Sequence, residues 1–352
     1  MGKSRRRLLL LSYAFAPSIG GIETVSDELA RVFSRRGYAV TVLTATPYMG
    51  EEQDQPFRVL RRPGMMELVR EIGRADLVLQ SNMSLRIAWP LWLLFPRKPF
   101  IVVHHTTLSR SEGRLIWKDR IKRCLLWRPY CLSVSNFLTS TIQAPSYIIR
   151  NPYANTVFRI MPEIERNKDL LFVGRLVTAK GVDTLLAAFP AVLKHRPQST
   201  LSIVGTGIEE DALRNLASSL GIEKSVFFLG PKQGAELAKL MNQHRILVVP
   251  SRSRPPEALS VVVIEGIACG CVPVASRLGG LPEAVGDAGV LYEEGNRAEL
   301  ADILIRLLTT HQLLDFYRSK ANQHLIHFEP DAVADAYEFH FNSCSHGELR
   351  PA

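Results

Sequence analysis

Two acidic side chains, Glu257 and Glu265, stand at the start of an apolar run in the second half of the chain. Glu257 lies in the expected loop "PSRSRPPEALS", and Glu265 lies about one turn inside a helix expected over residues 261–269. A carboxylate in a buried helix costs free energy unless it is paired or hydrogen-bonded. Glu265 could accept hydrogens from two ribose hydroxyls, and Glu257 could contact a sugar beside a phosphate. Two acids satisfied within the protein are the alternative.

Two cations stand at another expected strand end, in "VGRLVTAKG". Arg175 leaves the strand and Lys180 stands at the start of the helix that follows. A planar guanidinium fork and a compact ammonium charge suit adjacent oxygens of a diphosphate. Surface salt bridges are the alternative interpretation of this pair.

Glycines follow two further expected strands. Gly20 and Gly21 come between the first strand and a helix, where backbone N–H groups can approach a phosphate. The stretch "IVGTGIEE" imitates a dinucleotide-binding loop, but Glu210 replaces its third glycine. Gly205 therefore indicates a turn beside a nucleotide rather than a nicotinamide site.

These residues are positioned by a repeated alternation of short apolar strands and helices. Continuous apolar strands separated by helices predict parallel sheets that are covered on both faces. The alternation lapses in the polar stretch near residues 156–168 and then restarts. We therefore predict an α/β protein with two doubly wound, Rossmann-like domains facing a cleft, over residues 1–160 and 161–330. The final helix, at 330–343, is expected to pack back on the first domain.

Length and composition agree with two folded domains. The chain has 352 residues, of which 46% are hydrophobic, and its five cysteines show no metal-binding or disulfide spacing. The apolar start, "RRRLLLLSYAF", is interpreted as a buried strand and not as a secretion signal. The apolar stretch 87–96 is too short and too rich in proline to span a membrane. A cytoplasmic protein is expected.

The positive charge is concentrated in the first half of the chain. Residues 1–165 carry 24 Lys and Arg against 13 Asp and Glu, whereas the whole chain has a net charge of +9. Residues 110–128 combine an apolar stripe with a basic flank, which predicts a helix at an anionic membrane surface. A core helix with a solvated basic side is the alternative. Without a nucleic-acid motif, the charge does not predict a nucleic-acid partner.

Together, the segments "GGIE", "VGRLVTAKGVDTL", "VGTG", "PSRSRPPEALSVVVIEGIACGCVPVAS" and "GGLPEAV" resemble those of the retaining glycosyltransferases of GT-B fold, group 1 or family 4 type. This family includes phosphatidylinositol mannosyltransferases, sucrose synthases and bacterial-type glycogen synthases. The resemblance covers nearly the whole chain and is strongest in the second half. It implies that Arg175 and Lys180 hold the donor diphosphate, that Glu265 holds the ribose and that Glu257 contacts the donor sugar.

The resemblance also implies roles for other residues. Gly20 and Gly21 match the turn facing the phosphates, and a histidine after a strand of the first domain touches the donor sugar. The pair "HH" offers His104 and His105, and the residues that follow favour His105. Further donor-binding positions are Gly205 and the backbone at the helix start, Ser260 and Val261.

Two departures from the family pattern stand out. Ser260 replaces a frequent glycine before the buried helix, which leaves backbone N–H groups able to bind phosphate. In "IRNPYA", Asn151 remains but Pro152 replaces a glycine, which places the ligand contacts of that loop in doubt.

The expected activity is transfer of a sugar from a nucleoside-diphosphate sugar to a hydroxyl acceptor with retention, without metal or cofactor. No Asp-x-Asp motif is present in the sequence. The basic first half suggests an acceptor that is anionic or held at the inner face of a membrane, such as a lipid-linked glycan. A sugar-nucleotide epimerase of the same fold would need paired acids in the first domain, which we do not see. A non-catalytic nucleotide-sugar binder would tolerate loss of the charged residues named above.

Overall fold

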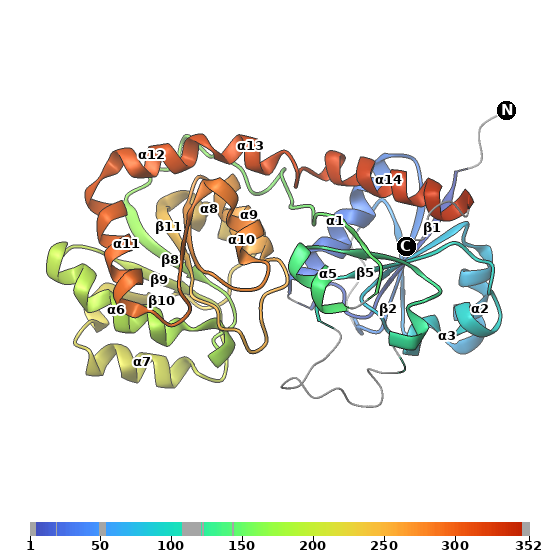
Figure 1. Cartoon of the computed structure of the whole chain (residues 1–352), viewed down its shortest axis with the longest axis horizontal. Helices are drawn as coiled ribbons and strands as arrows, with labels where there is room; N and C mark the ends of the chain where they lie inside the picture. Colours follow the sequence, from blue (N-terminus) through green and yellow to red (C-terminus); the bar gives the residue numbers. More distant parts are fainter. Residues whose placement is uncertain are drawn as a thin grey trace. The chain divides into compact units, whose positions relative to one another are not determined.

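The computed structural model describes residues 5–18, 20–48, 54–107, 121, 123–142 and 144–346. The chain divides into two compact units. Unit 1 comprises residues 1–153 and 327–352, and unit 2 comprises residues 154–326. The division therefore falls at residues 153 and 154, where the sequence placed it at 160, and the last helix belongs to unit 1 (Figure 1). No helix in the described part of the chain is long and apolar enough to cross a membrane.

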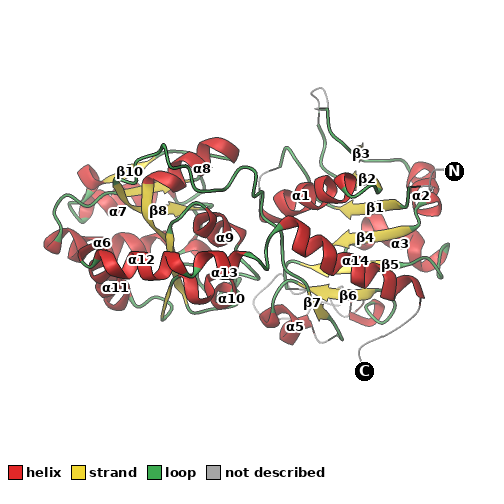
Figure 2. Ribbon diagram, turned by 90° about the horizontal axis from the view of Figure 1, so that it is seen from above, coloured by secondary structure: helices red, strands yellow, loops and turns green. Residues whose placement is uncertain are grey.

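Unit 1 is a parallel sheet with helices on both faces. Its strands pair in the order β3-β2-β1-β4-β5-β6-β7 (Figure 2). The described elements are β1 (Arg7–Ser12), α1 (Gly21–Arg35), β2 (Ala39–Thr44), β3 (Arg58–Arg61), α2 (Met65–Arg74), β4 (Leu77–Ser81), α3 (Leu85–Leu93), β5 (Phe100–His104), β6 (Tyr130–Ser133), α5 (Asn136–Ile142), β7 (Tyr147–Ile148) and α14 (Pro330–His346).

Strand β1, near the middle of the unit 1 sheet, contributes a run of apolar side chains to the core. Leu8, Leu9, Leu10 and Leu11 of β1 are all buried, as two helix-covered faces require. The chain leaves β1 toward β2 and β3, and then returns to the other side of β1 to form β4. The loops after β1 and β4 therefore diverge at a switch point, which is where ligands of such sheets bind.

Helix α14 returns from the end of the chain to pack on α1. The ring of Phe33 lies 5.9 Å from Tyr337 and 5.1 Å from Phe341. Arg36, just after α1, forms ion pairs of 3.2 Å with Asp331 and with Glu338. These contacts make the final helix a part of unit 1.

Unit 2 is a second parallel sheet, with the strand order β10-β9-β8-β11-β12-β13. Its elements are β8 (Lys168–Val173), a 3-10 turn (Thr178–Lys180), α6 (Val182–His195), β9 (Leu201–Val204), α7 (Glu210–Ser219), a 3-10 turn (Glu223–Ser225), β10 (Val226–Phe228), α8 (Gly234–Gln243), β11 (His244–Val249), α9 (Val261–Ala268), β12 (Val272–Ser276), α10 (Leu281–Val285), a 3-10 turn (Gly286–Ala288), β13 (Val290–Tyr292), α11 (Arg297–Thr309), α12 (His311–Ser319) and α13 (Ala321–Leu325).

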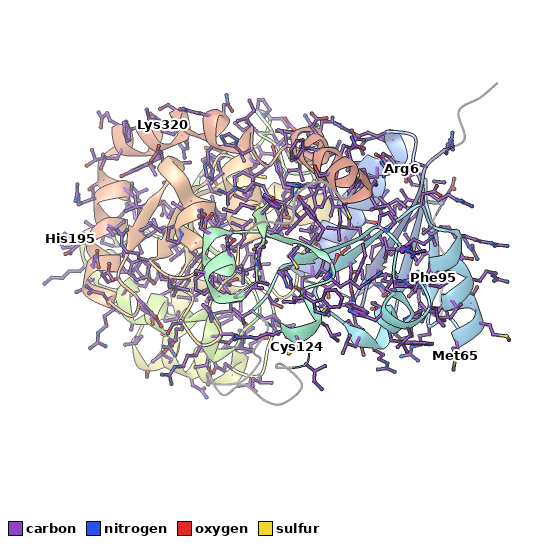
Figure 3. All side chains as sticks on the ribbon, turned by 45° about the vertical axis from the view of Figure 1, so that its right-hand side comes forward. Arg6, Met65, Phe95, Cys124, His195 and Lys320 are labelled. Atoms are coloured by element: carbon purple, nitrogen blue, oxygen red, sulfur yellow. The ribbon has the colours of Figure 1, made fainter. Side chains whose placement is uncertain are left out.

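One core of unit 2 lies where α6, α7 and α11 cover the sheet. Phe172 of β8, Phe189 of α6 and Leu304 of α11 are buried there together. Polar side chains lie outside this core, and His195 at the end of α6 projects away from unit 2 (Figure 3). The prediction of doubly wound parallel sheets is confirmed for both units.

Candidate active site

The switch point of unit 2 lies between its central strands β8 and β11. From β8 the chain continues to β9 and β10 on one side, and β11, β12 and β13 follow on the other. The loops that leave the carboxyl ends of β8 and β11 therefore diverge and leave room for a ligand. Arg175 and Lys180 lie on the first of these loops, and Glu257 lies on the second.

The two cations of the first loop differ in their surroundings. The Arg175 side chain is exposed and has no hydrogen-bond or ion-pair partner among the described residues. Lys180 ends the 3-10 turn, and its ammonium group forms a short ion pair with the carboxylate of Glu257. Both partners are partly buried, at 25% and 18% exposure of the side chain. The structure thus joins Lys180 to Glu257, while Arg175 stands as an unpaired cation.

Glycines fix the course of the loop after β8. Gly181 has a left-handed φ of 63°, and a Cβ atom there would lie 1.9 Å from the carbonyl oxygen of Pro250. Gly205, after β9, has a φ of 138°, and its Cβ would lie 1.8 Å from the carbonyl oxygen of Gly174. Gly205 therefore packs against the loop that carries Arg175, and this close packing is one reason for a glycine here. From the sequence, Gly205 was expected to lie beside the nucleotide.

Glu257 is held by contacts that the sequence did not reveal. The Ser251 hydroxyl donates to its carboxylate at 3.2 Å. The backbone N–H of Gly280 donates to the Glu257 carbonyl at 2.8 Å, and Gly279 packs so closely that a Cβ would lie 2.2 Å from the same carbonyl oxygen. The glycine pair of "GGLPEAV" indicates in the sequence that a close backbone contact is made there. The sequence does not show that Glu257 is the partner.

Helix α9 begins beside this loop and carries the second acid. Ser260 is its N-cap and Val261 its first residue; both are buried, and the Ser260 side chain makes no capping hydrogen bond. The N-terminal N–H groups of a helix favour anions. The start of α9 is therefore suited to a phosphate.

Glu265 follows one turn later in α9. It is 7% exposed and has no side-chain partner in the described part of the chain. Burial raises the pKa of this carboxyl to about 7. Such a group gains from hydroxyl donors that a ligand brings, because these stabilise its ionised form.

In unit 1, Gly20 and Gly21 lie at the start of α1. A Cβ at Gly20 would approach the carboxylate of Glu23 to 2.4 Å, whereas Gly21 has no atom within 4 Å of a Cβ position. Gly21 is exposed and leaves open space at the helix start. That space would admit a ligand.

The two histidines lie at the end of β5 in unit 1. His104 is fully buried and His105 is 6% exposed. Burial lowers the pKa of His104 to about 3 and that of His105 to about 4, so both rings are neutral at pH 7. Asn82 fixes this strand end, because its side-chain oxygen accepts the backbone N–H of His105 at 2.7 Å.

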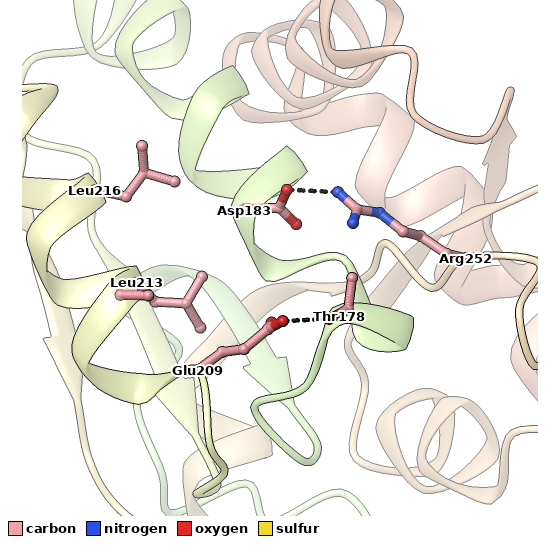
Figure 4. Close-up of a pocket in the computed structure, with 7 residues that line it drawn as sticks. Thr178, Asp183, Glu209, Leu213, Leu216 and Arg252 are labelled. Atoms are coloured by element: carbon pink, nitrogen blue, oxygen red, sulfur yellow. Dashed lines mark hydrogen bonds and ion pairs between the residues drawn. The ribbon is translucent and has the colours of Figure 1, made fainter.

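A pocket of about 210 Å³ lies beside the loop after β8 (Figure 4). Its charged side chains are already paired: Arg252 with Asp183, and Glu209 with the Thr178 hydroxyl. Leu213 and Leu216 of α7 complete the wall, and no proposed site residue lines it. We therefore infer that the residues lining this pocket stabilise the loop after β8. Among the described residues, no three His, Cys, Asp or Glu side chains gather in a group that could hold a metal ion.

Two family models together match most of the chain. Residues 19–147 match the model of glycosyltransferase family 4, and residues 155–324 match that of glycosyl transferases group 1. The chain carries the domains of family 4 and group 1 glycosyltransferases. Its two parallel-sheet units are those of the GT-B fold.

Similar glycosyltransferases include two curated corynebacterial proteins. A D-inositol 3-phosphate glycosyltransferase of Corynebacterium jeikeium is 35% identical over 53% of this chain and 47% of its own length. A GDP-mannose-dependent monoacylated phosphatidylinositol monomannoside mannosyltransferase of Corynebacterium glutamicum is 37% identical over 38% of this chain and 36% of its own. The matched stretches thus span about half or less of these relatives.

One solved structure matches nearly the whole chain. Anabaena HepE in complex with UDP and glucose superposes with a TM-score of 0.80 at 20% identity. The match covers 96% of this chain and 100% of that one. At this identity the likeness establishes the fold alone.

Proposed function

We propose that this glycosyltransferase moves a sugar from a nucleoside-diphosphate sugar to a hydroxyl acceptor, with retention at the anomeric carbon. The observation that carries the proposal is the set of groups at the switch point of unit 2. The two diverging loops carry the unpaired Arg175 and the Lys180–Glu257 ion pair. The helix that follows, α9, has an uncapped start. Anion-binding groups at a switch point suit a nucleotide diphosphate.

Each group has a role toward the donor. Arg175 and Lys180 hold the diphosphate, and the N–H groups of Ser260 and Val261 bind it at the start of α9. Glu265 accepts hydrogen bonds from the ribose hydroxyls, which favour its ionised form and offset the cost of burial. Glu257 contacts the donor sugar once the diphosphate has drawn Lys180 toward itself.

The reaction that these groups suit is a front-face displacement. The bond between the anomeric carbon and the diphosphate oxygen breaks, and the acceptor oxygen forms its bond on the same face. The proton of the acceptor hydroxyl passes to the leaving phosphate. Arg175 and Lys180 stabilise the charge that grows on that phosphate, which is electrostatic catalysis. We propose that these cations act where other glycosyltransferases use a metal, because the sequence has no Asp-x-Asp motif.

Unit 1 provides the acceptor-binding half. The neutral ring of His105 serves as a hydrogen-bonding group toward the donor sugar, and Gly20 and Gly21 admit the phosphates. The names of the corynebacterial relatives support an acceptor from glycolipid or glycan synthesis. We propose an anionic or lipid-linked acceptor and a cytoplasmic protein that works at the inner face of a membrane.

Two measurements test this function. A thermal-shift comparison of UDP, GDP and ADP should show one diphosphate stabilising the protein more than the others, which would identify the base. Proton NMR of a transfer product should show the anomeric configuration of the donor. An inverted product would contradict the front-face mechanism, and no stabilisation by any diphosphate would contradict the donor site.

A further inference from the structure

Asn82, the first residue after β4, makes contacts that reach the end of the neighbouring strand β5. Its side-chain oxygen accepts the backbone N–H of His105 at 2.7 Å and also that of Thr106 at 3.2 Å. Its own backbone N–H donates to the Val103 carbonyl at 2.7 Å. One residue therefore holds the chain just before and just after the point where β5 ends.

The backbone of Asn82 has the left-handed conformation, with a φ of 57°. Asparagine tolerates this conformation better than most residues do, and glycine adopts it without strain. Glycine would, however, lack the side-chain oxygen that accepts the two N–H groups after β5. The residue at position 82 thus meets two requirements, which are the turn of its own loop and the contact with the next strand.

Neighbouring side chains hold the loop that carries Asn82. The Ser81 hydroxyl lies 3.2 Å from the hydroxyl of Ser26 in α1, and both serines are buried. The side-chain amide of Gln80 donates to the Ser84 carbonyl at 2.9 Å, and Gln80 is fully buried. Contacts of residues on both sides of Asn82 therefore fix its position relative to β5.

The ring of His105 has no comparable anchor of its own. Burial lowers the pKa of this ring to about 4, and the nearby Asn151 side chain opposes that effect. Neither ring nitrogen, however, makes a hydrogen bond of normal geometry to a described residue. A neutral ring without such bonds can offer its nitrogens to a ligand, and its direction depends on the backbone that carries it.

We propose that Asn82 is a positioning residue for the transfer reaction and that it acts through His105. By holding the backbone N–H groups of His105 and Thr106, it keeps the His105 ring in the direction in which the ring meets the donor sugar. Preorganised contacts lower the barrier because they need no rearrangement during the reaction, and a small displacement of one group costs a large factor in rate. The proposal rests on the proposed function, which gives His105 its role toward the sugar.

Steady-state kinetics of Asn82→Gly test this role, because glycine keeps the left-handed backbone and removes the side-chain oxygen. The reaction followed is release of nucleoside diphosphate from whichever UDP-, GDP- or ADP-sugar the wild type uses. We expect kcat to fall about ten-fold or more, whereas the affinity for the free diphosphate, which unit 2 binds, should stay within about two-fold. Asn82→Asp keeps an oxygen that can accept both N–H groups and should retain most of the wild-type kcat.

Arg62→Gly is the matched control for the backbone. Outside glycine, Arg62 is the other residue in the described part of the chain with a left-handed φ, of 46°, and it is likewise the first residue after a strand, β3. Its side chain donates to the Ala45 carbonyl at 3.1 Å and not to the chain after β5. This variant should change kcat by less than about two-fold.

A double variant separates a positioning role from a merely structural one. If Asn82 acts through His105, Asn82→Gly should lower kcat little further in a His105→Ala background, because the group that it positions is already absent. A structural role alone predicts losses that multiply. Thermal unfolding of each variant shows whether it is folded.

Three results would overturn the proposal: losses that multiply, a wild-type kcat in folded Asn82→Gly, or a wild-type kcat in His105→Ala. If Asn82→Gly does not fold, a ten-fold loss of kcat in folded Asn82→Asp would overturn it, because the accepting oxygen is still present. The proposed function fails separately, if the wild type releases no nucleoside diphosphate from any of the sugars. Release by the wild type together with multiplying losses would contradict the role of Asn82 alone.

Discussion

Lys180 and Glu257 form an ion pair between the loops after β8 and β11, although 76 residues separate them in the chain. Ser251 donates to the same carboxylate, so Glu257 keeps one partner if Lys180 turns away. A diphosphate would compete with Glu257 for the ammonium group. In the free site the charge of Lys180 is thus balanced by that of Glu257, and donor binding would release Glu257 toward the sugar.

The two cations should matter more to turnover than to binding. Interactions that strengthen as charge grows on the leaving phosphate lower the barrier itself. Removing one such donor costs roughly 3–4 kcal/mol, or about two to three decades in rate. Arg175→Ala and Lys180→Ala should each lower kcat by about that order, and the double variant by less than the sum. Lys180→Arg should also fail, because a planar fork cannot replace a compact charge paired with Glu257.

Lys194→Ala provides the control for these variants, because Lys194 is exposed at the end of α6. Steady-state kinetics on folded proteins should leave its turnover near that of the wild type. Surface cations would change stability by under about 1 kcal/mol and turnover hardly at all. Near-normal turnover in both Arg175→Ala and Lys180→Ala would remove the catalytic assignment.

Glu265 should make nucleotide binding depend on pH. Its pKa is about 7 in the folded protein, and ribose hydroxyls bind the ionised form. Affinity should therefore fall as pH drops below 7, by up to about ten-fold per pH unit. Glu265→Gln should bind weakly at pH 8, with no such dependence, and should approach the wild type near pH 5. Calorimetry at several pH values checks this, and an unchanged affinity in the variant at pH 8 would show that the ribose role is wrong.

Ionisation of Glu265, which should favour nucleotide binding, should lower the stability of the folded protein. Its folded pKa is raised from 4.5, so the stability contributed by the protonated form is present below pH 4.5 and is lost as pH rises through 7. Glu265→Gln should not lose this stability. Its free energy of unfolding should therefore rise relative to that of the wild type by on the order of 3 kcal/mol between pH 4.5 and pH 7. Urea unfolding at both ends of the window measures it.

Two glycines should respond differently to alanine. A Cβ at Gly205 meets the Gly174 carbonyl at 1.8 Å with a φ of 138°, so Gly205→Ala should cost at least about 2 kcal/mol of stability. Gly21→Ala meets no atom and should change stability by less than about 1 kcal/mol. If Gly21 faces the phosphates, activity should nevertheless fall. Full activity in a folded Gly21→Ala protein would exclude that role.

Charge in the first half of the chain should direct the protein to anionic lipid. Residues 108–120 and 122, most of the expected basic helix at 110–128, lie outside the described residues; Trp127, near its end, is 66% exposed. Co-sedimentation should show binding to anionic vesicles that weakens as salt rises. Equal binding to neutral vesicles, or binding to neither, would contradict a membrane-surface role.

The long buried strands could be predicted because their apolar runs are continuous. The short edge strands β3, β7 and β13 do not stand out in the sequence pattern. β3 has four residues, "RVLR", with charged ends, and β7 has two residues. Such strands carry little periodic signal, and their pairing depends on a neighbour that is already in place.

The strand-end positions of the candidate site residues could also be predicted, because parallel strands end at one edge of a sheet. Their contacts could not. The pairing of Lys180 with Glu257, and the support of Glu257 by Ser251 and Gly280, depend on how separate loops pack. Gly205 carries a nucleotide-like signal in the sequence, but in the structure it lies against the backbone of Gly174. Glycine patterns show that close approach is needed and do not show what approaches.

We propose that the switch point of unit 2 activates a nucleoside-diphosphate sugar. The most direct test is release of nucleoside diphosphate from a panel of UDP-, GDP- and ADP-sugars, with the Arg175→Ala/Lys180→Ala double variant in parallel. We expect the wild type to release nucleoside diphosphate from one nucleotide series, and the variant to release it at least about two decades more slowly. Equal release by the two proteins, or none from any donor, would contradict it.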